Sequence, residues 1–236
     1  MESEQNVRER DNIMASIAID GPAGAGKSTI AKLVAKELNA IYVDTGAMYR
    51  AIAIYFLRHE LNPDIPEQVE NACRNIEVSI SYEDGVQQVW LNGENVTPLL
   101  RTEAVGNMAS KSSAKQPVRE KLLQLQRDMA VKYKVVMDGR DIGTNVLPNA
   151  EVKIYLTASS AERARRRYEE LRQKGEDCNI EEIERDIIER DTQDMSRAIA
   201  PLKQAEDAYY LDSSSLTIPE VVAEILKKCE DAAIWR

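Results

Sequence analysis

Residues that mark disulfide-rich and zinc-binding proteins are scarce in this chain of 236 residues. Its three cysteines, Cys73, Cys178 and Cys229, are far apart and form no CxxC or Cys/His pattern. This spacing indicates neither a disulfide framework nor a zinc site. The single histidine, His59, stands near the end of a predicted helix with no cysteine and no second histidine to share a metal, so we expect an ordinary helix residue there.

Long apolar runs and an excess of basic residues are also missing. No run approaches the roughly 18 apolar residues of a membrane span, and the N-terminal MESEQNVRERDN lacks the apolar core of a secretory signal. The formal net charge of -9 argues against a dedicated nucleic-acid binder, which would present a broad basic surface. We expect a cytoplasmic globular protein with no membrane or nucleic-acid partner, in which local positive charge meets any anionic ligand.

What the chain does contain is a regular alternation of strand-like and helix-like segments. Apolar runs at 16–20 and 40–44 alternate with amphipathic helical patterns at 28–38 and 47–61. This is the βαβ rhythm of a parallel sheet covered by helices. It resumes with a helix over 117–133, strands over 134–138 and 151–156, charged helical stretches over 161–174 and 180–192, a strand over 208–214 and a closing helix over 218–228.

An antiparallel segment interrupts this rhythm. Positions 76, 78, 80 and 82 are apolar or aromatic, which is the period of two that a half-buried strand requires. Turn sequences, Asp84-Gly85 and Asn92-Gly93, lie on either side of a second run over 86–91. We therefore predict a hairpin-rich insertion in the parallel sheet.

The stretch GPAGAGKST follows the first predicted strand and begins the first predicted helix. It matches the phosphate-binding loop pattern G-x4-G-K-[ST] in the context that the pattern requires. Glycines let backbone N–H groups surround phosphate oxygens, Lys27 neutralises charge and Ser28 can hold magnesium. We predict that a nucleoside triphosphate contacts Gly21, Pro22, Ala23, Gly24, Ala25, Gly26, Lys27, Ser28 and Thr29.

The loop is shared by molecular switches, motors and kinases. The Asn-Lys-x-Asp and Asp-x-x-Gly elements of guanine-nucleotide switches occur nowhere in the chain. A motor would usually be larger and would couple to a polymer, which the compact length and acidic charge do not favour. A small-molecule kinase fits best.

Arginines outside the loop indicate that the acceptor carries a phosphate of its own. Arg50 and Arg140 each follow a predicted strand, at the end where α/β sheets bind ligands. Arg190 and Arg197 bracket Asp194 and would share one face of a continuous helix. Guanidinium groups match phosphate geometry, so we expect them to converge on an anion. The arginine-dense run over 162–174, with its interleaved glutamates, fits either a solvated helix or a cover over phosphates.

Taken together, these motifs resemble the bacterial cytidylate kinase, or (d)CMP kinase, family of P-loop nucleoside monophosphate kinases. The resemblance covers nearly everything from about residue 17 to the last helix, through DGPAGAGKST, YVDTGAMYR, VMDGRDIGT, ERARRRY and RDTQDMSRAIAPL. It implies an α/β fold with a parallel sheet covered by helices, a β-rich antiparallel insertion domain and a short helical lid. The implied reaction transfers the γ-phosphoryl group of ATP to CMP or dCMP, with magnesium accompanying ATP.

The resemblance also implies boundaries. Residues 13–62 and 108–236 would form the P-loop core, with the lid at about 160–192 and the monophosphate-binding insertion over 63–107. Residues 1–12 fall outside the family core as a flexible extension. Asn145 stands where many relatives carry an apolar residue, and we expect it to touch no residue with a role in the site. We expect a monomer.

The family's site residues carry over to the positions that match its motifs. The CMP site would consist of Thr45, Arg50, Ser110, Arg119, Arg140, Asp141, Arg190, Asp194 and Arg197. The transferring charge would be stabilised by Lys27, Arg140, Arg197 and the lid arginines Arg163, Arg166 or Arg167. No general base is needed, because a monophosphate is already ionised. Asp138 has the placement of a carboxylate that holds Ser28 or magnesium-bound water.

The implied base pocket would favour cytosine over uracil. A carboxylate such as Asp141 accepts a hydrogen bond from the N4 amino group of cytosine but repels the oxygen that uracil has there. Two alternatives stay open at this point: a kinase for another acceptor, such as UMP, AMP or a non-nucleotide metabolite, and a regulatory or RNA-associated P-loop protein. Ordinary caps and ion pairs would also account for Asp141 and Asp194.

Overall fold

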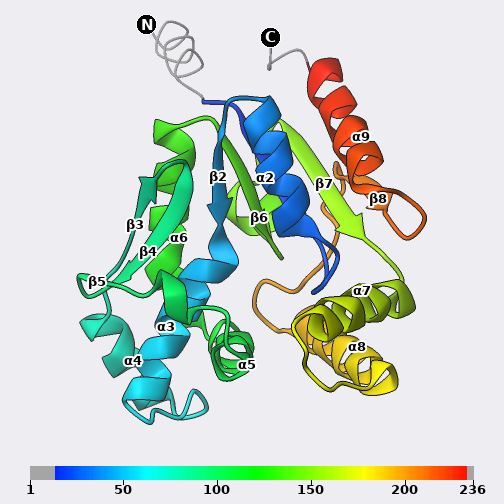
Figure 1. The fold of residues 1–236 in the computed structure, drawn as a ribbon. Helices are drawn as coiled ribbons and strands as arrows, with labels where there is room; N and C mark the ends of the chain where they lie inside the picture. The colour runs from blue at the N-terminus through cyan, green and yellow to red at the C-terminus, as the bar shows by residue number, and fades with distance from the viewer. Residues whose placement is uncertain (1–13, 233–236) are drawn as a thin grey trace, which may run out of the picture.

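A five-stranded parallel sheet forms the centre of the protein (Figure 1). The computed structural model describes residues 14–232, so the extension predicted at residues 1–12 lies outside the described residues. The strand order is β2-β6-β1-β7-β8, and every neighbouring pair is parallel, which confirms the predicted sheet. The strands are β1 (Ser16–Asp20), β2 (Ile41–Asp44), β6 (Val135–Gly139), β7 (Val152–Thr157) and β8 (Tyr209–Asp212).

Helices cover both faces of this sheet. Successive side chains of a strand point to opposite faces. Ile17 and Ile19 of β1 pack on the face of α2 (Lys27–Glu37) and α9 (Ile218–Asp231). Ala18 packs on the opposite face, that of α3 (Thr45–Arg58) and α6 (Gln116–Lys132). Burial on both faces explains why the strands read as continuous apolar runs.

The hairpin-rich insertion is confirmed as a separate three-stranded antiparallel sheet. Its strands are β3 (Val78–Glu83), β4 (Val86–Leu91) and β5 (Glu94–Asn95). The sequence pattern missed the two helices around it, α4 (Pro66–Asn75) and α5 (Glu103–Ser112), and the short turn η1 (Thr97–Leu99). Helix α5 runs across the boundary expected at 107–108.

Side chains of the insertion cover the free edge of β2. The Gln87 side chain accepts a hydrogen bond from the Asp44 N–H at 2.9 Å and donates one to the Asp44 carbonyl at 3.1 Å. The Tyr82 hydroxyl donates to the Tyr42 carbonyl at 3.0 Å. Because β2 is an edge strand, these bonds satisfy backbone groups that have no strand partner. They also attach the insertion beside the carboxyl end of β2.

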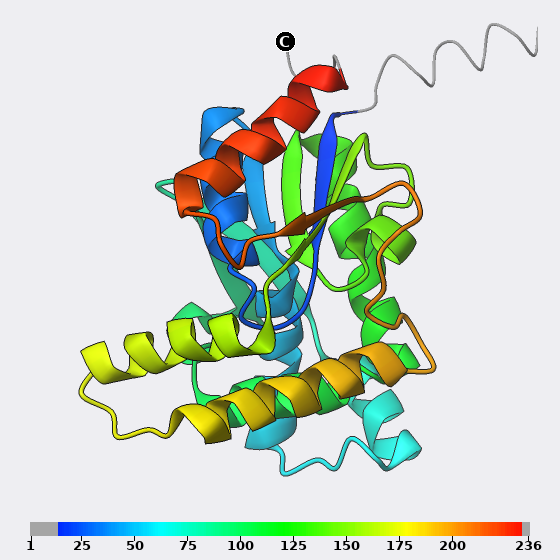
Figure 2. The same cartoon turned by 90° about the vertical axis from the view of Figure 1, so that its right-hand side faces the viewer.

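Two charged helices, α7 (Ser160–Gln173) and α8 (Ile180–Ser196), lie side by side and project away from the sheet (Figure 2). They agree with the two helical stretches predicted from the sequence. The Ser160 hydroxyl donates to Glu184 at 2.7 Å, and Arg163 forms an ion pair with Asp191 at 2.6 Å, so polar contacts link the two helices. Within residues 14–232, no helix is long and apolar enough to span a membrane.

The backbone at Gly21 predicts a stability effect. Its φ is 151°, and a Cβ added there would lie 1.9 Å from the Leu156 carbonyl oxygen. Gly21→Ala should therefore lower the free energy of unfolding by about 2–4 kcal/mol, measured by urea denaturation. The matched control is Gly106→Ala in α5, where the added Cβ meets nothing within 4 Å, and it should be neutral or slightly stabilising. Wild-type stability of Gly21→Ala would contradict this expectation.

Candidate active site

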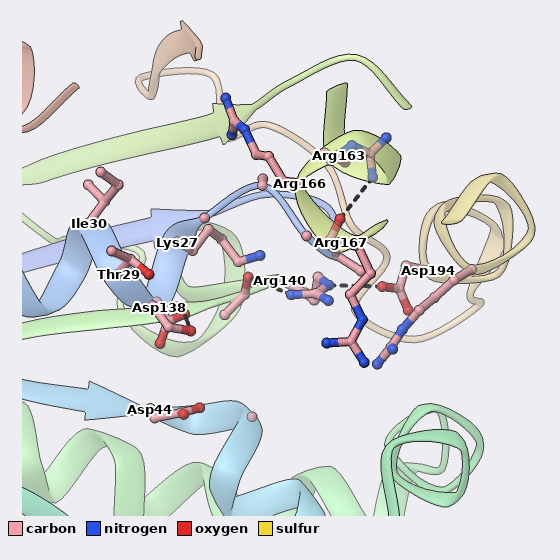
Figure 3. Close-up of a pocket in the computed structure, with 18 of the residues that line it drawn as sticks. Lys27, Thr29, Ile30, Asp44, Asp138, Arg140, Arg163, Arg166, Arg167 and Asp194 are labelled. Atoms are coloured by element: carbon pink, nitrogen blue, oxygen red, sulfur yellow. Dashed lines mark hydrogen bonds and ion pairs between the residues drawn. The ribbon is translucent and has the colours of Figure 1, made fainter. Parts of the chain in front are cut away.

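One cavity of about 700 Å³ opens at the carboxyl ends of β1, β2 and β6. Its lining residues include eleven lysines and arginines but only six aspartates and glutamates, although the whole chain carries a net charge of -9. A cleft lined by one sign of charge focuses the field onto a ligand of the opposite sign. The cavity is therefore suited to an anion, and Figure 3 shows lining residues that come from both sides of it.

The predicted phosphate loop connects β1 to α2 at one side of the cavity. Gly26, in the left-handed conformation with φ of 83°, caps the N-terminus of α2. The Lys27 ammonium donates to the Pro22 carbonyl at 2.7 Å and so bridges the loop. Of the predicted contact residues, 23–29 line the cavity, whereas Gly21 and Pro22 lie outside its lining.

The Ser28 hydroxyl donates to Asp138 Oδ2 at 3.1 Å, as the placement of Asp138 at the end of a predicted strand suggested. Burial raises the pKa of Asp138 to about 6, and the nearby Asp44 adds to the shift. Among the described residues there is no group of three or more His, Cys, Asp or Glu that could hold a metal by itself. A hydroxyl backed by a carboxylate fits magnesium, which uses few protein ligands and takes its others from phosphates and water.

Partly buried arginines line the other side of the cavity. Burial lowers the pKa of Arg50, Arg190 and Arg197, and the charge of Arg140 lowers it further in each case. This mutual repulsion means that a bound anion would stabilise the whole group. The Thr45 hydroxyl also lines the cavity and donates to the Asp138 carbonyl at 2.8 Å.

Asp194 connects two of these arginines. Its Oδ2 accepts from Arg140 Nε at 2.8 Å, and its Oδ1 pairs with Arg197 at 2.5 Å. Burial alone would raise the pKa of Asp194, but Arg140 and Arg197 outweigh it and hold the pKa below its usual range. Arg190 and Arg197 would share a face only on a continuous helix, and the structure does not give them one: α8 ends at Ser196, and Arg197 is extended with ψ of 135°. Arg197 reaches Asp194 from beyond the helix end.

A second buried ion pair joins Arg119 of α6 to Asp141. Arg119 also donates to the Ser113 carbonyl at 3.2 Å, and its guanidinium lies 5.5 Å from the centre of the Tyr49 ring. Asp141 precedes a π-helical turn, η2 (Ile142–Val146), whose Asn145 donates to Asp141 Oδ2 at 3.0 Å. The expectation that Asn145 touches no site residue is therefore wrong. Its amide helps to orient the carboxylate.

Ser110 lies in the same part of the cavity, on the last turns of α5. Its carbonyl accepts a hydrogen bond from Arg197 at 3.3 Å. The structure thus brings the residues of the predicted CMP site together around one cavity, from α3, α5, α6, the end of β6 and α8.

Arg163 is fixed at the base of α7. Its three guanidinium nitrogens donate to the Ala158 carbonyl at 2.9 Å, the Ala23 carbonyl at 2.9 Å and Asp191 at 2.6 Å. The side chain is buried, and it ties the phosphate loop to α7 and α8. Arg163 is therefore held as a structural link among three segments.

Arg166 and Arg167 differ in direction. Arg166 donates to Glu162 at 2.8 Å and to the Ser213 carbonyl at 2.7 Å. Arg167 pairs with Glu170 at 2.8 Å, and its side chain is 48% exposed. In Figure 3, Arg167 extends toward Arg140 and Asp194, whereas Arg166 points the other way. Arg167 is thus the α7 arginine directed at the arginine cluster.

Several cavity residues were not predicted from the sequence. Arg101 of the insertion pairs with Asp44 at 3.1 Å and is largely exposed. Asp44 also caps α3, because its Oδ1 accepts from the Ala47 N–H at 2.9 Å. The end of the cavity near α9 is lined by Leu216, Ile218 and Val221. An arginine signal could have suggested Arg101, but apolar residues at the start of an amphipathic helix carry no comparable signal.

The comparisons with known proteins agree with one another. A family model described as Cytidylate kinase matches residues 17–231. The cytidylate kinase of Caldicellulosiruptor bescii is 48% identical over 212 residues, which cover 90% of this chain and 94% of that protein. The cytidylate kinase of Bacillus cereus is 48% identical over 211 residues, covering 89% and 94%. A solved structure of an uncharacterized protein from Eubacterium ventriosum matches with a TM-score of 0.50 at 11% identity, covering 92% of this chain and 99% of that one, which speaks only to the fold.

The environment of Lys27 predicts proton uptake when a triphosphate binds. Burial, followed by the charge of Arg140, lowers the pKa of Lys27 to about 7, so at pH 8 most of the free protein lacks this proton. Triphosphate oxygens favour the charged ammonium and raise its pKa again. Binding of ATP with magnesium should take up protons at pH 8, and the uptake should shrink toward pH 6, where Lys27 is already protonated.

Isothermal titration calorimetry in buffers of different ionisation enthalpy measures this uptake. Lys36→Met, on the exposed side of α2, is the matched control and should behave as the wild type does. Absence of proton uptake at pH 8 would show that Lys27 is already charged in the free protein.

Proposed function

The chain belongs to the cytidylate kinase family, and on that premise we propose that it transfers the γ-phosphoryl group of ATP to CMP or dCMP. The products are ADP and CDP or dCDP, so the enzyme is an ATP-dependent phosphotransferase of pyrimidine nucleotide metabolism. The observation that carries the proposal is the family match over residues 17–231. The basic cavity supports it, because both substrates are phosphates.

In this proposal, ATP binds with its phosphates in the loop of residues 21–29. The N–H groups of the loop and the N-terminus of α2 surround the phosphate oxygens, and Lys27 contacts the transferring group. Magnesium, when bound, would neutralise charge on the β- and γ-phosphates, with Ser28 as its protein ligand and Asp138 behind Ser28. The base lies toward Leu216, Ile218 and Val221, where the cavity wall is apolar.

CMP occupies the other side of the cavity. Arg50 and Arg140 bind its phosphate beside Thr45, and the pair of Arg119 and Asp141 binds its base together with Ser110. Asp194 and Arg190 lie toward the ribose hydroxyls. Asp141 accepts from the N4 amino group of cytosine, and this contact distinguishes cytosine from uracil.

Catalysis consists of positioning and charge stabilisation. A phosphate oxygen of CMP attacks the γ-phosphorus in line, a new P–O bond forms, and the bond to the β–γ bridging oxygen breaks to release ADP. Lys27, Arg140 and Arg197 stabilise the negative charge that develops on the transferring phosphoryl group. Arg167 joins them from the lid because it is directed at this cluster, whereas Arg163 holds the phosphate loop against α7 and Arg166 borders the ATP side.

No general base takes part in this scheme. The accepting phosphate is already ionised near neutral pH. The single histidine, His59, lies at the end of α3 against Tyr55, with ring centres 4.2 Å apart, and does not line the cavity. We propose that the enzyme works as a monomer, since all the residues to which this scheme gives a role in CMP binding line one cavity of a single chain, and that it works in the cytoplasm.

The acceptor itself is the first test. ADP formation from ATP and magnesium should be measured with CMP, dCMP, UMP, AMP, GMP and no acceptor. We expect turnover mainly with CMP and dCMP, because cytosine presents its N4 amino donor to Asp141 at the position where uracil presents an oxygen. Preferred turnover with another monophosphate would overturn the proposal that CMP is the acceptor, but not the proposal that the phosphate loop binds ATP. ATP binding without any turnover, together with salt-sensitive RNA binding, would favour the regulatory alternative.

Asp141→Asn should reduce the discrimination between cytosine and uracil. The isosteric amide loses the charge-assisted hydrogen bond to N4, so kcat/KM for CMP should fall roughly 10-fold to 100-fold while the KM for ATP stays near wild type. The ratio of UMP to CMP activity should rise. The control is Asp128→Asn, which removes one carboxylate from the exposed side of α6 and should change neither substrate. An equal loss for CMP and ATP would show that Asp141 only supports the fold.

A further inference from the structure

Tyr42 contacts the carboxylate that backs the proposed magnesium site. It lies on the edge strand β2, where Asp44 is opposite Asp138 in the neighbouring strand β6 and Tyr42 is opposite Val136. Residues two apart on a strand point to the same face, so Tyr42 and Asp44 share the face of α2 with Asp138. From there the Tyr42 hydroxyl donates to Asp138 Oδ1 at 2.9 Å.

The two oxygens of Asp138 therefore have different donors. Oδ1 accepts from Tyr42, and Oδ2 accepts from the Ser28 hydroxyl at 3.1 Å. When Ser28 donates its proton to Oδ2, the lone pairs of its oxygen are left for a cation. The direction of those lone pairs depends on how the Asp138 carboxylate is rotated, and the second hydrogen bond, from Tyr42, opposes that rotation.

We propose that Tyr42 is a positioning residue for magnesium: it holds the Asp138 carboxylate in the orientation that aims the Ser28 oxygen at the metal. This inference rests on the proposed function, in which Ser28 binds magnesium together with ATP. Partners of this kind, one step behind the metal ligands, usually affect metal affinity about 10-fold to 100-fold.

The Tyr42 hydroxyl remains a donor throughout the working range of pH. Burial, and then the charges of Asp138 and Asp44, raise the pKa of Tyr42 far above its ordinary value. The ring has separate contacts of its own: Lys32 of α2 lies with its ammonium 5.6 Å from the ring centre. Tyr42→Phe keeps the ring and removes only the hydroxyl, so it separates positioning from packing.

The test compares nucleotide binding with and without metal. The probe is the non-hydrolysable ATP analogue AMP-PNP, titrated calorimetrically into wild type and Tyr42→Phe in excess Mg²⁺ and, separately, in EDTA. We expect Tyr42→Phe to weaken binding about tenfold in Mg²⁺ and to leave binding in EDTA unchanged. Electron paramagnetic resonance of Mn²⁺ in the AMP-PNP complex should show the same loss of metal affinity directly.

Tyr82→Phe is the matched control. It also removes one phenol hydroxyl near β2, but that hydroxyl bonds to the Tyr42 carbonyl and not to Asp138. It should match the wild type in both titrations. Wild-type affinity of Tyr42→Phe in Mg²⁺, or an equal loss in Mg²⁺ and EDTA, would overturn the positioning role. If wild type itself bound AMP-PNP equally with and without Mg²⁺, the proposed magnesium site would fail first, independently of Tyr42.

Discussion

Repulsion among partly buried arginines is the constraint on which the arrangement of the site depends. Arg50, Arg190 and Arg197 each lose water and face the charge of Arg140, while Asp194 forms ion pairs with Arg140 and Arg197. Like charges that lie close together and are partly removed from water are costly unless a ligand of opposite charge binds among them. The free protein therefore presents a cluster of positive charge that phosphates can neutralise, although the overall charge of the chain is negative.

The fold brings this charge together from separate parts of the chain. Parallel strands end at the same edge of the sheet, which gathers the phosphate loop, Asp44 and the segment 138–141. The insertion and the pair α7 and α8 add arginines from two sides (Figures 1 and 2). Gln87 attaches the insertion to the end of β2, and Arg163 attaches α7 to the phosphate loop. Both attachments use backbone groups of the sheet or the loop, so the added parts are held by the core itself.

Much of the fold could be predicted because its signals are local. These signals are the apolar runs of strands buried on both faces, the glycine-rich loop between a strand and a helix, and the alternating strand pattern followed by two turn sequences. Each depends only on residues that are neighbours in the chain. Helices α4 and α5 were missed, because each has only ten residues and is held by contacts with core helices, α4 with α6 and α5 with α3, which no local pattern shows. The end of α8 was missed for a similar reason: Arg197 leaves the helix to pair with Asp194, and this contact requires the finished fold.

The sequence by itself determined that the protein has a phosphate loop, a parallel sheet with a hairpin insertion, and arginines suited to a second phosphate. It identified these because backbone geometry and residue chemistry are local properties. The tertiary structure alone decided which arginines are available: Arg163 is occupied by two carbonyls and Asp191, whereas Arg167 is directed at the cluster. It also decided that Asn145 supports Asp141 and that Tyr42 supports Asp138. Side-chain hydrogen bonds between distant segments depend on packing, and for that reason no stretch of sequence specifies them.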